Sequence, residues 1–382
     1  MTRAMRRALS WIGRALLFAA IALCFAPTVI PPFLDRVYYQ GPPSDHYDGA
    51  RFFNPDPAPT GPRQGSVVDR LMNSEPQMVW PDAVPVNPSI PPRRVEGAEM
   101  VVTWIGHATV LVQTQGLNIL TDPIWSDVAS PVSFAGPRRV RQPGVRFEDL
   151  PRIDLVLVSH NHYDHLDLAT LRRLWERDRP LIVTGLGNDI LMRSEGIEAA
   201  ARDWGKALYF VDGRWVDQPP PAECPAPPQW CGPISVRVLR SYHWTSRWLT
   251  DRNRALWAAF RVDLPGGGVF FAGDTGWGGG NWAREAAAYG PYRLAILPIG
   301  AYAPRQVMRN SHINPGEALA VFNILRPTLA LGMHWGTFQL GREGIDAPPR
   351  AIAELARRQG LPESRFVTTE VGQSFRVPPL AN

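Results

Sequence analysis

Three of the eight histidines in this 382-residue chain fall within six positions, in the segment HNHYDH at residues 160–165. An apolar run typical of a buried strand, Leu155–Ser159, precedes the segment, and a helical pattern begins at Leu168. A loop between a strand and a helix can aim several short side chains at one point. Because imidazole nitrogens and carboxylate oxygens are good ligands for zinc and similar ions, the segment predicts a metal site.

Three further histidine or aspartate residues come directly after apolar runs of the chain. They are His243, Asp274 and His334, which close the runs at residues 236–242, 269–273 and 329–333. Taken alone, each is equally well explained as an ordinary polar loop residue. Since a rigid site needs rigid supports, three such residues at matching positions predict that the strand ends and the HNHYDH loop share one site.

Apolar runs and helical patterns predict the secondary structure of the body. We expect strands at residues 100–104, 110–113, 119–121, 155–159, 181–184, 236–239, 256–262, 269–272, 294–298 and 329–333. We expect helices at residues 168–177, 188–195, 282–288, 315–325 and 349–359. The early strands come in sequence and the later ones mix with helices, a pattern that two sheets sandwiched between helices would satisfy.

The order HxHxDH, then His, Asp and His, resembles the metal-ligand order of the metallo-β-lactamase superfamily. The resemblance implies an α/β fold, a four-layer αβ/βα sandwich with the site at one edge. It implies two Zn²⁺ ions, although the same ligands accept other divalent metals. The first ion would be held by His160, His162 and His243, the second by Asp164, His165 and His334, and Asp274 would bridge them.

Longer segments resemble the branch of N-acylphosphatidylethanolamine-hydrolysing phospholipases D. They are WIGHATVLV (104–112), LTDPIWS (120–126), GPRRVR (136–141), SHNHYDHLD (159–167), FFAGDTG (270–276), LPIGAY (297–302) and MHWGTF (333–338). The resemblance runs from about Glu99 to Phe375. It implies a phosphodiesterase that acts at a phospholipid or membrane surface and releases N-acylethanolamine and phosphatidic acid.

Several residues near the predicted ligands are expected to support catalysis. Asp164 and His312 are the predicted catalytic residues, although His312 also suits a helix cap. Asp122 would accept a hydrogen bond from a ligand histidine or act as a turn residue, and His107 would contact the ligands from outside. Tyr302 is a predicted substrate contact. His46 is expected on the surface, and Trp244, Trp257 and Trp335 would pack in the core or line an acyl-chain pocket.

Residues 1–34 are expected to be a targeting segment, either a cleaved signal peptide or a membrane anchor. Three arginines among the first seven residues precede an apolar run whose continuous core, Ala15–Ala26, is short for a spanning helix. Pro27, Pro31 and Pro32 disfavour a long unbroken helix. The positive charge at the front predicts that the catalytic body faces the periplasm or the exterior.

Residues 35–98 are rich in proline and are expected to form an arm that wraps the hydrolase domain, residues 99–382. Cys224 and Cys231 flank a further proline-rich loop, where they would form a disulfide or remain unrelated thiols. The sequence is compatible with a homodimer.

The formal net charge of +5 is small for this length, and without a dense basic block the sequence gives no sign of nucleic-acid binding. The densest arginine cluster comprises Arg138, Arg139, Arg141, Arg146 and Arg152. It would be a solvated loop or a contact for phosphate or anionic headgroups.

Two alternatives to the phospholipase reading remain open. A lactonase or another hydrolase of a small soluble anion could use the same dinuclear site. A non-catalytic metal-binding membrane protein is disfavoured, because a degenerate relative would be expected to lose at least one ligand.

Overall fold

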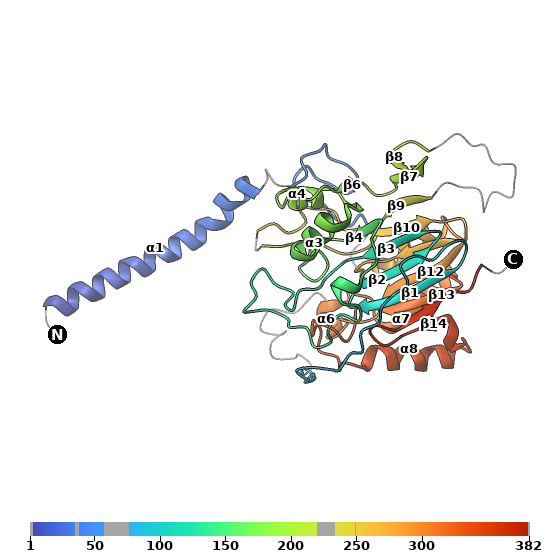
Figure 1. Ribbon diagram of the computed structural model, residues 1–382. Coiled ribbons are helices and arrows are strands. Elements are labelled where there is room, and N and C mark those ends of the chain that lie inside the picture. The colour runs from blue at the N-terminus through green and yellow to red at the C-terminus, as the bar shows by residue number, and fades with distance from the viewer. Residues whose placement is uncertain (1–2, 35–37, 57–75, 220–233, 249, 381–382) are drawn as a thin grey trace.

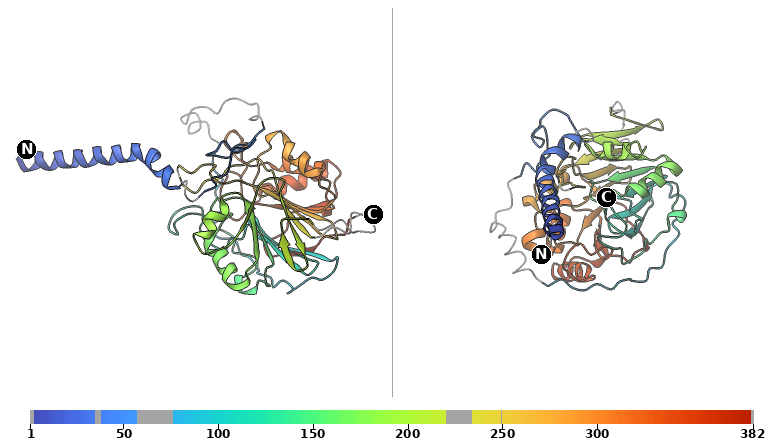
Figure 2. Two further views of the ribbon diagram at one scale, coloured as in Figure 1. Left: turned by 90° about the horizontal axis from the view of Figure 1, so that it is seen from above. Right: turned by 90° about the vertical axis from the view of Figure 1, so that its left-hand side faces the viewer.

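The computed structural model describes residues 3–34, 38–56, 76–219, 234–248 and 250–380 (Figure 1). Within these residues the strands form two sheets that pack face to face, and helices lie on the outer faces of the sheets (Figure 2). The predicted α/β fold, a four-layer αβ/βα sandwich, is confirmed.

The first sheet has the strand order β15-β1-β2-β3-β4-β5-β6. Its strands are β1 (Met100–Gly106), β2 (Thr109–Thr114), β3 (Leu117–Thr121), β4 (Leu155–Val158), β5 (Leu181–Gly185), β6 (Ala200–Arg202) and β15 (Ser374–Arg376). Strands β1 to β3 form an antiparallel meander, whereas β3 to β6 are parallel. Strands β1, β3 and β4 therefore run in the same direction.

The second sheet has the strand order β14-β13-β12-β11-β10-β9-β7-β8. Its strands are β7 (Ala207–Val211), β8 (Arg214–Val216), β9 (Ser235–Leu239), β10 (Ala259–Asp263), β11 (Gly268–Phe271), β12 (Tyr292–Pro298), β13 (Leu329–Met333) and β14 (Phe366–Val367). Strands β9 and β11 both pair antiparallel with β10, and β11 to β14 are parallel, so β9, β11 and β13 share one direction.

The helices of the body are α3 (Leu168–Asp178), α4 (Asn188–Arg193), α5 (Asn281–Ala287), α6 (Arg305–Met308), α7 (Pro315–Leu325) and α8 (Ala347–Arg358). Their starts follow from local chemistry. The Asp167 side chain caps α3 by accepting hydrogen bonds from two backbone N–H groups. A capping box of Asn314 and Glu317 starts α7, with Pro315 in its first turn.

All ten predicted strands and all five predicted helices are present, with differences of a few residues at their ends. The prediction omits β6, β8, β14 and β15, which have only two or three residues each. It also omits β7, although its residues ALYFV have the apolar character of a strand.

Alternation along β4 shows how the core is built. Leu155 and Leu157 belong to the apolar cluster between the sheets, whereas Val156 and Val158 belong to a second cluster with Leu171 and other side chains of α3. Successive side chains of a strand point to opposite faces, so a continuous apolar run is buried on both sides. Each fully buried aliphatic side chain stabilises the fold by about 1.5–3 kcal/mol.

Helix α1 (Arg3–Leu34) stands away from the body (Figure 1). Its segment Met5–Phe25 is long and apolar enough to cross a membrane, a test that a signal sequence also passes. The prediction that Pro27, Pro31 and Pro32 prevent a long helix is wrong. A proline removes one N–H donor but keeps a helical φ, and these three fall in the last eight residues of α1.

The two described parts of the N-terminal arm contact different parts of the body. Residues 38–56 bury Tyr47 and Phe52 in an apolar cluster with Leu256 and Trp257. Residues 76–98 follow another path, on which the Val84 N–H donates to the Val140 carbonyl and Trp80 Nε1 donates to the Glu343 carbonyl.

The prediction that His46 lies on the surface is wrong, because this residue is only 7% exposed. Its ring nitrogens lie 2.6 Å from Asp45 and 2.8 Å from Asp203, and the ring stacks on Trp204. Burial lowers the pKa of His46, but the hydrogen bonds to Asp203 and Asp45 outweigh it and raise the pKa above its usual value. The charged imidazole thus helps to fasten the arm to the body.

Replacing this histidine should destabilise the protein more at low pH than at high pH. Because the pKa of His46 is raised in the folded state, its contribution is complete below the unfolded value of about 6.5 and is lost as pH rises through the folded value. We expect His46→Gln to lower the free energy of unfolding by about 1 kcal/mol at pH 6 and by less at pH 9. Denaturant unfolding at both values checks this, and an equal loss at both would contradict it.

Candidate metal centre

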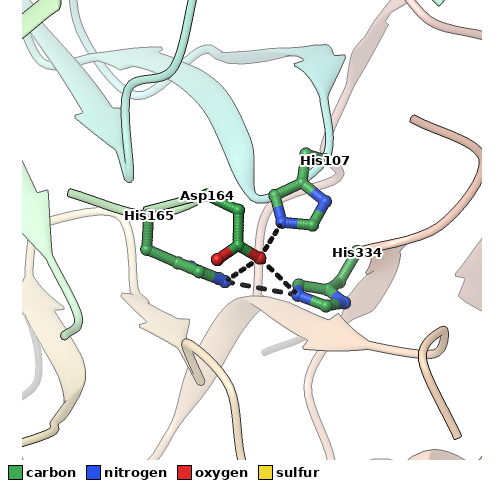
Figure 3. A group of neighbouring side chains, drawn as sticks. All are labelled: His107, Asp164, His165 and His334. Carbon is green, nitrogen blue, oxygen red and sulfur yellow. Dashed lines mark hydrogen bonds and ion pairs between the residues drawn. The ribbon is translucent and has the colours of Figure 1, made fainter. Parts of the chain in front are cut away.

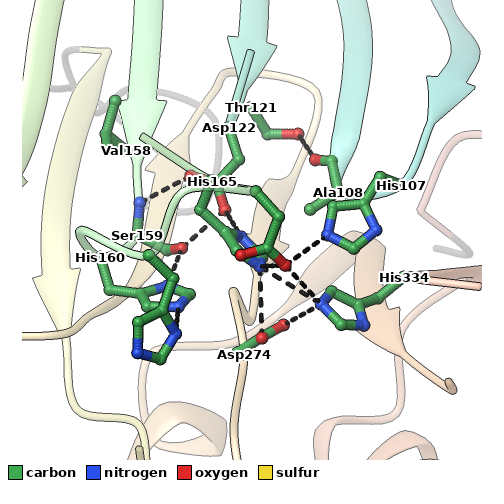
Figure 4. A network of polar contacts seen from close by, with 12 residues as sticks. His107, Ala108, Thr121, Asp122, Val158, Ser159, His160, His165, Asp274 and His334 are labelled. Atoms are coloured by element: carbon green, nitrogen blue, oxygen red, sulfur yellow. Dashed lines mark hydrogen bonds and ion pairs between the residues drawn. The ribbon is translucent and has the colours of Figure 1, made fainter. Parts of the chain in front are cut away.

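The predicted ligands meet at one edge of the sandwich because the strands before them share one direction within each sheet (Figure 4). In the first sheet His107, Asp122 and His160 follow β1, β3 and β4, and in the second His243, Asp274 and His334 follow β9, β11 and β13. His107, Asp122 and His334 have φ angles of 54°, 31° and 63°. Non-glycine residues rarely adopt such angles, so these three positions carry backbone strain.

A glycine allows the ligand-bearing turns of the two sheets to approach each other. Gly273 precedes Asp274, and Ser159 precedes His160. A Cβ atom on Gly273 would lie 2.5 Å from the Ser159 Cβ, and the φ of Gly273 is 58°. Because a side chain would clash there, this position needs glycine for the close approach and for its backbone angle.

His160, His162 and His243 form the first group of side chains. His162 Nδ1 lies 2.8 Å from His160 Nε2 and 3.4 Å from His243 Nε2. The Ser311 carbonyl, which can only accept, lies 2.8 Å from His243 Nδ1, so this nitrogen donates to it. The Nε2 lone pair of His243 is therefore left facing the other two rings.

A second group surrounds the carboxylate of Asp164 (Figure 3). Asp164 Oδ2 lies 2.9 Å from His107 Nε2, 3.2 Å from His165 Nε2 and 3.7 Å from His334 Nε2. These four residues offer ligand atoms that all lie within 4.8 Å of one another.

Asp274 lies between the two groups. Its Oδ1 is 3.1 Å from His334 Nε2, and its Oδ2 is 3.2 Å from His165 Nε2 and 3.9 Å from His243 Nε2. This is the position that a bridging carboxylate requires.

The protonation states of the first group and of the two carboxylates fit divalent metal ions. Burial holds the pKa of His160 and His243 well below the usual value and lowers that of His162 to about 4, so all three rings are neutral at pH 7. Burial raises the pKa of Asp164 and Asp274, but the neighbouring imidazoles outweigh it and hold both well below the usual range. Neutral imidazoles and ionised carboxylates are the forms that bind zinc. Burial lowers the pKa of His165 and His334, but Asp274 and Asp164 outweigh it and raise the pKa of His165 well above the usual value and that of His334 to about 9, so a metal ion at these two rings would replace a proton.

The buried atoms also fit a cation. Asp274 Oδ1 is shielded from solvent and has no hydrogen-bond partner among the described residues, although His334 Nε2 lies 3.1 Å away. Within the first group, His160 Nε2, His162 Nδ1 and His243 Nε2 face one another without a carboxylate between them. Cations beside these atoms would account for both features, because buried polar atoms are otherwise paired.

Asp122 supports the ligands from behind, as predicted from its position after a strand. Its Oδ2 lies 2.7 Å from His165 Nδ1 and accepts a 2.6 Å hydrogen bond from Ser159 Oγ. His160 Nδ1 lies 2.9 Å from the same hydroxyl, which has given its proton to Asp122 and therefore accepts. One carboxylate thereby fixes the tautomers of two histidines, and both turn Nε2 toward the site.

His107, predicted to contact the ligands from outside, lies close enough to Asp164 to belong to the second group itself. Burial lowers the pKa of His107 to about 3. Its backbone is fixed as well, since its N–H donates to Thr337 Oγ1 and its carbonyl accepts from the His334 N–H.

His312 also lies at this edge, with Nδ1 3.6 Å from Asp274 Oδ2 and 9% of the residue exposed. Burial lowers the pKa of His312 to about 4, so its ring is neutral at pH 7. Tyr302 follows β12 and is partly buried. The roles of His312 in catalysis and of Tyr302 as a substrate contact stay predictions.

The arginine cluster divides in the structure. Arg138, Arg146 and Arg152 are exposed, as both interpretations of the sequence expect, whereas Arg139 and Arg141 are each 7% exposed and neither form a solvated loop nor reach a headgroup. Arg139 Nη2 donates to the Ile124 carbonyl, and Arg141 Nη1 donates to the carbonyl of Gly336, two residues after His334. The GPRRVR segment therefore holds backbone near the site.

Two of the three tryptophans have the core role that the sequence predicts, and for Trp244 the acyl-chain pocket stays a prediction. Trp257 is fully buried and Trp335 stacks on Trp104, so both pack in the core. Trp244 lies with its ring centroid 4.2 Å from that of His162 and lines a cavity of about 380 Å³ beside His243. Cys224 and Cys231 lie outside the described residues.

The sequence prediction did not identify two residues that shape the site. Ser159 connects Asp122 to His160, and its place directly before the HNHYDH segment was a usable signal. Arg247 donates to the carbonyls of Asn161 and Leu166 in the loop that carries the predicted ligands, residues 160–166, which we call the metal loop. An isolated arginine in an irregular segment gave no such signal.

This sandwich, with its buried histidines and aspartates at one edge, is that of a metal-dependent hydrolase. A family model for the β-lactamase superfamily domain matches residues 117–335. N-acyl-phosphatidylethanolamine-hydrolyzing phospholipase D 1 of Caenorhabditis elegans is 36% identical over 284 residues, which are 72% of this chain and 75% of that protein. The chain belongs to the metallo-β-lactamase superfamily.

Two further comparisons concern a second relative and a neighbour in fold. The mitochondrial N-acyl-phosphatidylethanolamine-hydrolyzing phospholipase D of Saccharomyces cerevisiae is 32% identical, over 73% of this chain and 57% of that protein. The structure of an isothiocyanate hydrolase from Delia radicum gut bacteria has a TM-score of 0.53 at 18% identity, covering 73% of this chain and 99% of that one. This last likeness concerns the fold alone.

The metal content of variants should separate the two groups of ligands. After saturation with zinc and dialysis, we expect about two equivalents in the unaltered protein, about one in His243→Ala and fewer than one in Asp274→Ala, which would disturb both positions. Elemental analysis by mass spectrometry measures this. One equivalent in the unaltered protein, or an unchanged content in Asp274→Ala, would contradict the assignment.

Proposed function

We propose that this chain hydrolyses the phosphodiester bond of an N-acylated phosphatidylethanolamine and releases an N-acylethanolamine and phosphatidic acid. The observation that carries the proposal is the 36% identity over 72% of the chain with a nematode protein of that name. The clustering of all the predicted ligand side chains at one edge supports a working hydrolase.

The surroundings of the site support an anionic substrate. The cavity beside His243 is also lined by Trp244, Arg252, Val307 and Ser311. None of the described residues that line it is acidic, and the Arg252 guanidinium lies over the Trp244 ring at 4.1 Å. A cation on an aromatic face beside the metal ligands suits a phosphate group next to an apolar chain.

The chain's own residues would orient the reaction. Two bound divalent ions would supply an activated water and neutralise charge that develops on the phosphoryl oxygens. Asp122 and Ser159 keep the ligand rings in one tautomer, and His107 holds Asp164. His312 lies beside Asp274 and, as a neutral ring, can donate a hydrogen bond to the substrate.

The position of α1 supports a substrate that resides in a membrane. Tyr38, four residues after the last residue of α1, donates a 2.6 Å hydrogen bond to Asp251, in the segment that follows His243. The apolar helix therefore joins the body close to the candidate site. In this proposal α1 is retained as an anchor and the body faces the periplasm or the exterior.

An assay on lipid and soluble substrates in parallel tests the reaction. The purified, zinc-loaded protein should release N-acylethanolamine from N-acylphosphatidylethanolamine in detergent micelles. Release should stop on chelation and fall at least 100-fold in His162→Ala, because one metal loses a ligand. Chromatography with mass detection follows the product.

A soluble phosphodiester and a lactone are the controls for this assay. Turnover of either one without turnover of the lipid would overturn the phospholipase proposal and favour a hydrolase of small anions. Metal binding without turnover of any of the three would favour a non-catalytic metal-binding protein.

Membrane fractionation tests the anchor. If α1 is retained, the chain should sediment with membranes, leave them only in detergent and show an intact mass that includes residues 3–34. Leu16→Arg combined with Leu17→Arg should weaken this attachment, since each charge costs about 2.5–3.5 kcal/mol in the apolar layer. A mature protein that starts after residue 34 would instead identify a cleaved signal.

A further inference from the structure

Residues 243–248 and 250–254, which begin at His243, form what we call the brace segment. Besides the contacts of His243 and Trp244 with His162, this segment contacts the metal loop, residues 160–166, through Arg247. Arg247 Nη1 donates to the Asn161 carbonyl at 3.0 Å and to the Leu166 carbonyl at 2.9 Å. Its guanidinium lies over the ring of Tyr163 at 3.8 Å. A single side chain thus joins both ends of the loop that carries His162, Asp164 and His165.

Arg247 is itself held by a buried carboxylate. Asp251 is fully buried and accepts hydrogen bonds from the backbone N–H of Arg247 and of Trp248, and from the Ser246 hydroxyl. Its second oxygen accepts the hydroxyl of Tyr38 at 2.6 Å. Tyr38 belongs to the N-terminal arm, so a direct chain of contacts runs from the arm through Asp251 and Arg247 to the metal loop.

The arm holds the brace segment at three more places. Arg51 Nη2 donates to the Thr250 carbonyl at 3.0 Å, and the Phe52 N–H donates to the Asn253 carbonyl at 2.8 Å. Asn54 Nδ2 donates to the carbonyl of His243 at 2.9 Å. The last bond acts on the backbone of a predicted metal ligand.

We propose that Arg247 is a positioning residue for the metal loop, and that residues 38–56 hold Arg247 and His243 in place as a working part of the metal centre. The arm residues that take part in this inference, 38–56, lie outside the family model, which begins at residue 117. The inference rests on the metal site and not on the identity of the ester that the site cleaves.

The arm also connects α1 to the candidate site. Residues 35–37 alone separate the end of α1 from Tyr38, and the four Cα–Cα steps from Leu34 to Tyr38 span at most about 14 Å. The point where the chain leaves α1 is therefore close to the hydrogen bond that fixes Asp251. Attachment of the arm and order in the metal loop should change together.

Zinc affinity of the full-length protein in detergent tests the proposal without any substrate. Competition with a chromophoric chelator at fixed pH should show zinc affinity lowered at least tenfold in Arg247→Met, because groups that orient metal ligands typically contribute that much. Arg247→Lys should recover part of the loss, since an ammonium can still donate to one of the two carbonyls. Tyr38→Phe, which removes one oxygen atom, should lower zinc affinity by a smaller factor.

The chain offers a matched control for each variant. Arg177 also binds a loop through backbone carbonyls, those of Phe147 and Pro151, and it lies away from the metal loop. Tyr292 is a buried tyrosine outside the arm whose hydroxyl donates to the Ala286 carbonyl. Arg177→Met and Tyr292→Phe should lower thermal stability while zinc affinity stays unchanged.

Hydrogen exchange of the zinc-free protein gives an independent measurement. Arg247→Met and Tyr38→Phe should speed exchange at residues 160–166, whereas the two controls should not. If Arg247→Met fails to fold, the Tyr38→Phe pair still decides the matter. Unchanged zinc affinity and unchanged exchange in Tyr38→Phe, or equal losses in variant and control, would overturn the proposal. Neither measurement depends on turnover, so failure of the phospholipase assay would leave this test intact.

Discussion

The structure depends on placing several imidazoles and two carboxylates together in a dry edge between two sheets. Burial disfavours every charge there, and imidazole rings packed close to one another disfavour protonation of each other. The imidazole rings of the site therefore differ from one another in protonation state. His160, His162 and His243 stay neutral, whereas His165 lies between carboxylates that raise its pKa well above the usual value despite its burial. Neutral rings and ionised carboxylates bind cations directly, and a metal ion at His165 would replace its proton.

Convergence of these side chains has a cost in backbone conformation. Three site residues adopt positive φ angles, and Gly273 lets two turns from opposite sheets come together. Such backbone angles persist only where the surrounding structure holds them by several contacts at once. Two buried clusters on either side of β4 and the hydrogen bonds of Asp122 provide that rigidity.

The sequence predicts most of the frame of the site and little of what surrounds it. Strand β4 and the HNHYDH segment can be predicted because a continuous apolar run and closely spaced ligands are local patterns. The burial of His46, Arg139 and Arg141 cannot be predicted in this way, since the side chain of each is hydrogen-bonded by side chains or carbonyls distant in sequence. The continuous α1 was missed for the opposite reason, because a local rule about proline was given too much weight.

Proteins with this fold catalyse many different reactions, so the residues around the metal site determine which reaction takes place. Here the surroundings come partly from a segment that precedes the family domain. Phe52 and Tyr47 seat the arm in an apolar cluster, and Tyr38 and Asn54 then reach the segment that carries His243 and Arg247. Residues far apart in the chain thus determine how firmly the ligands are held. A hydrolase built in this way couples its metal centre to the residues that follow α1.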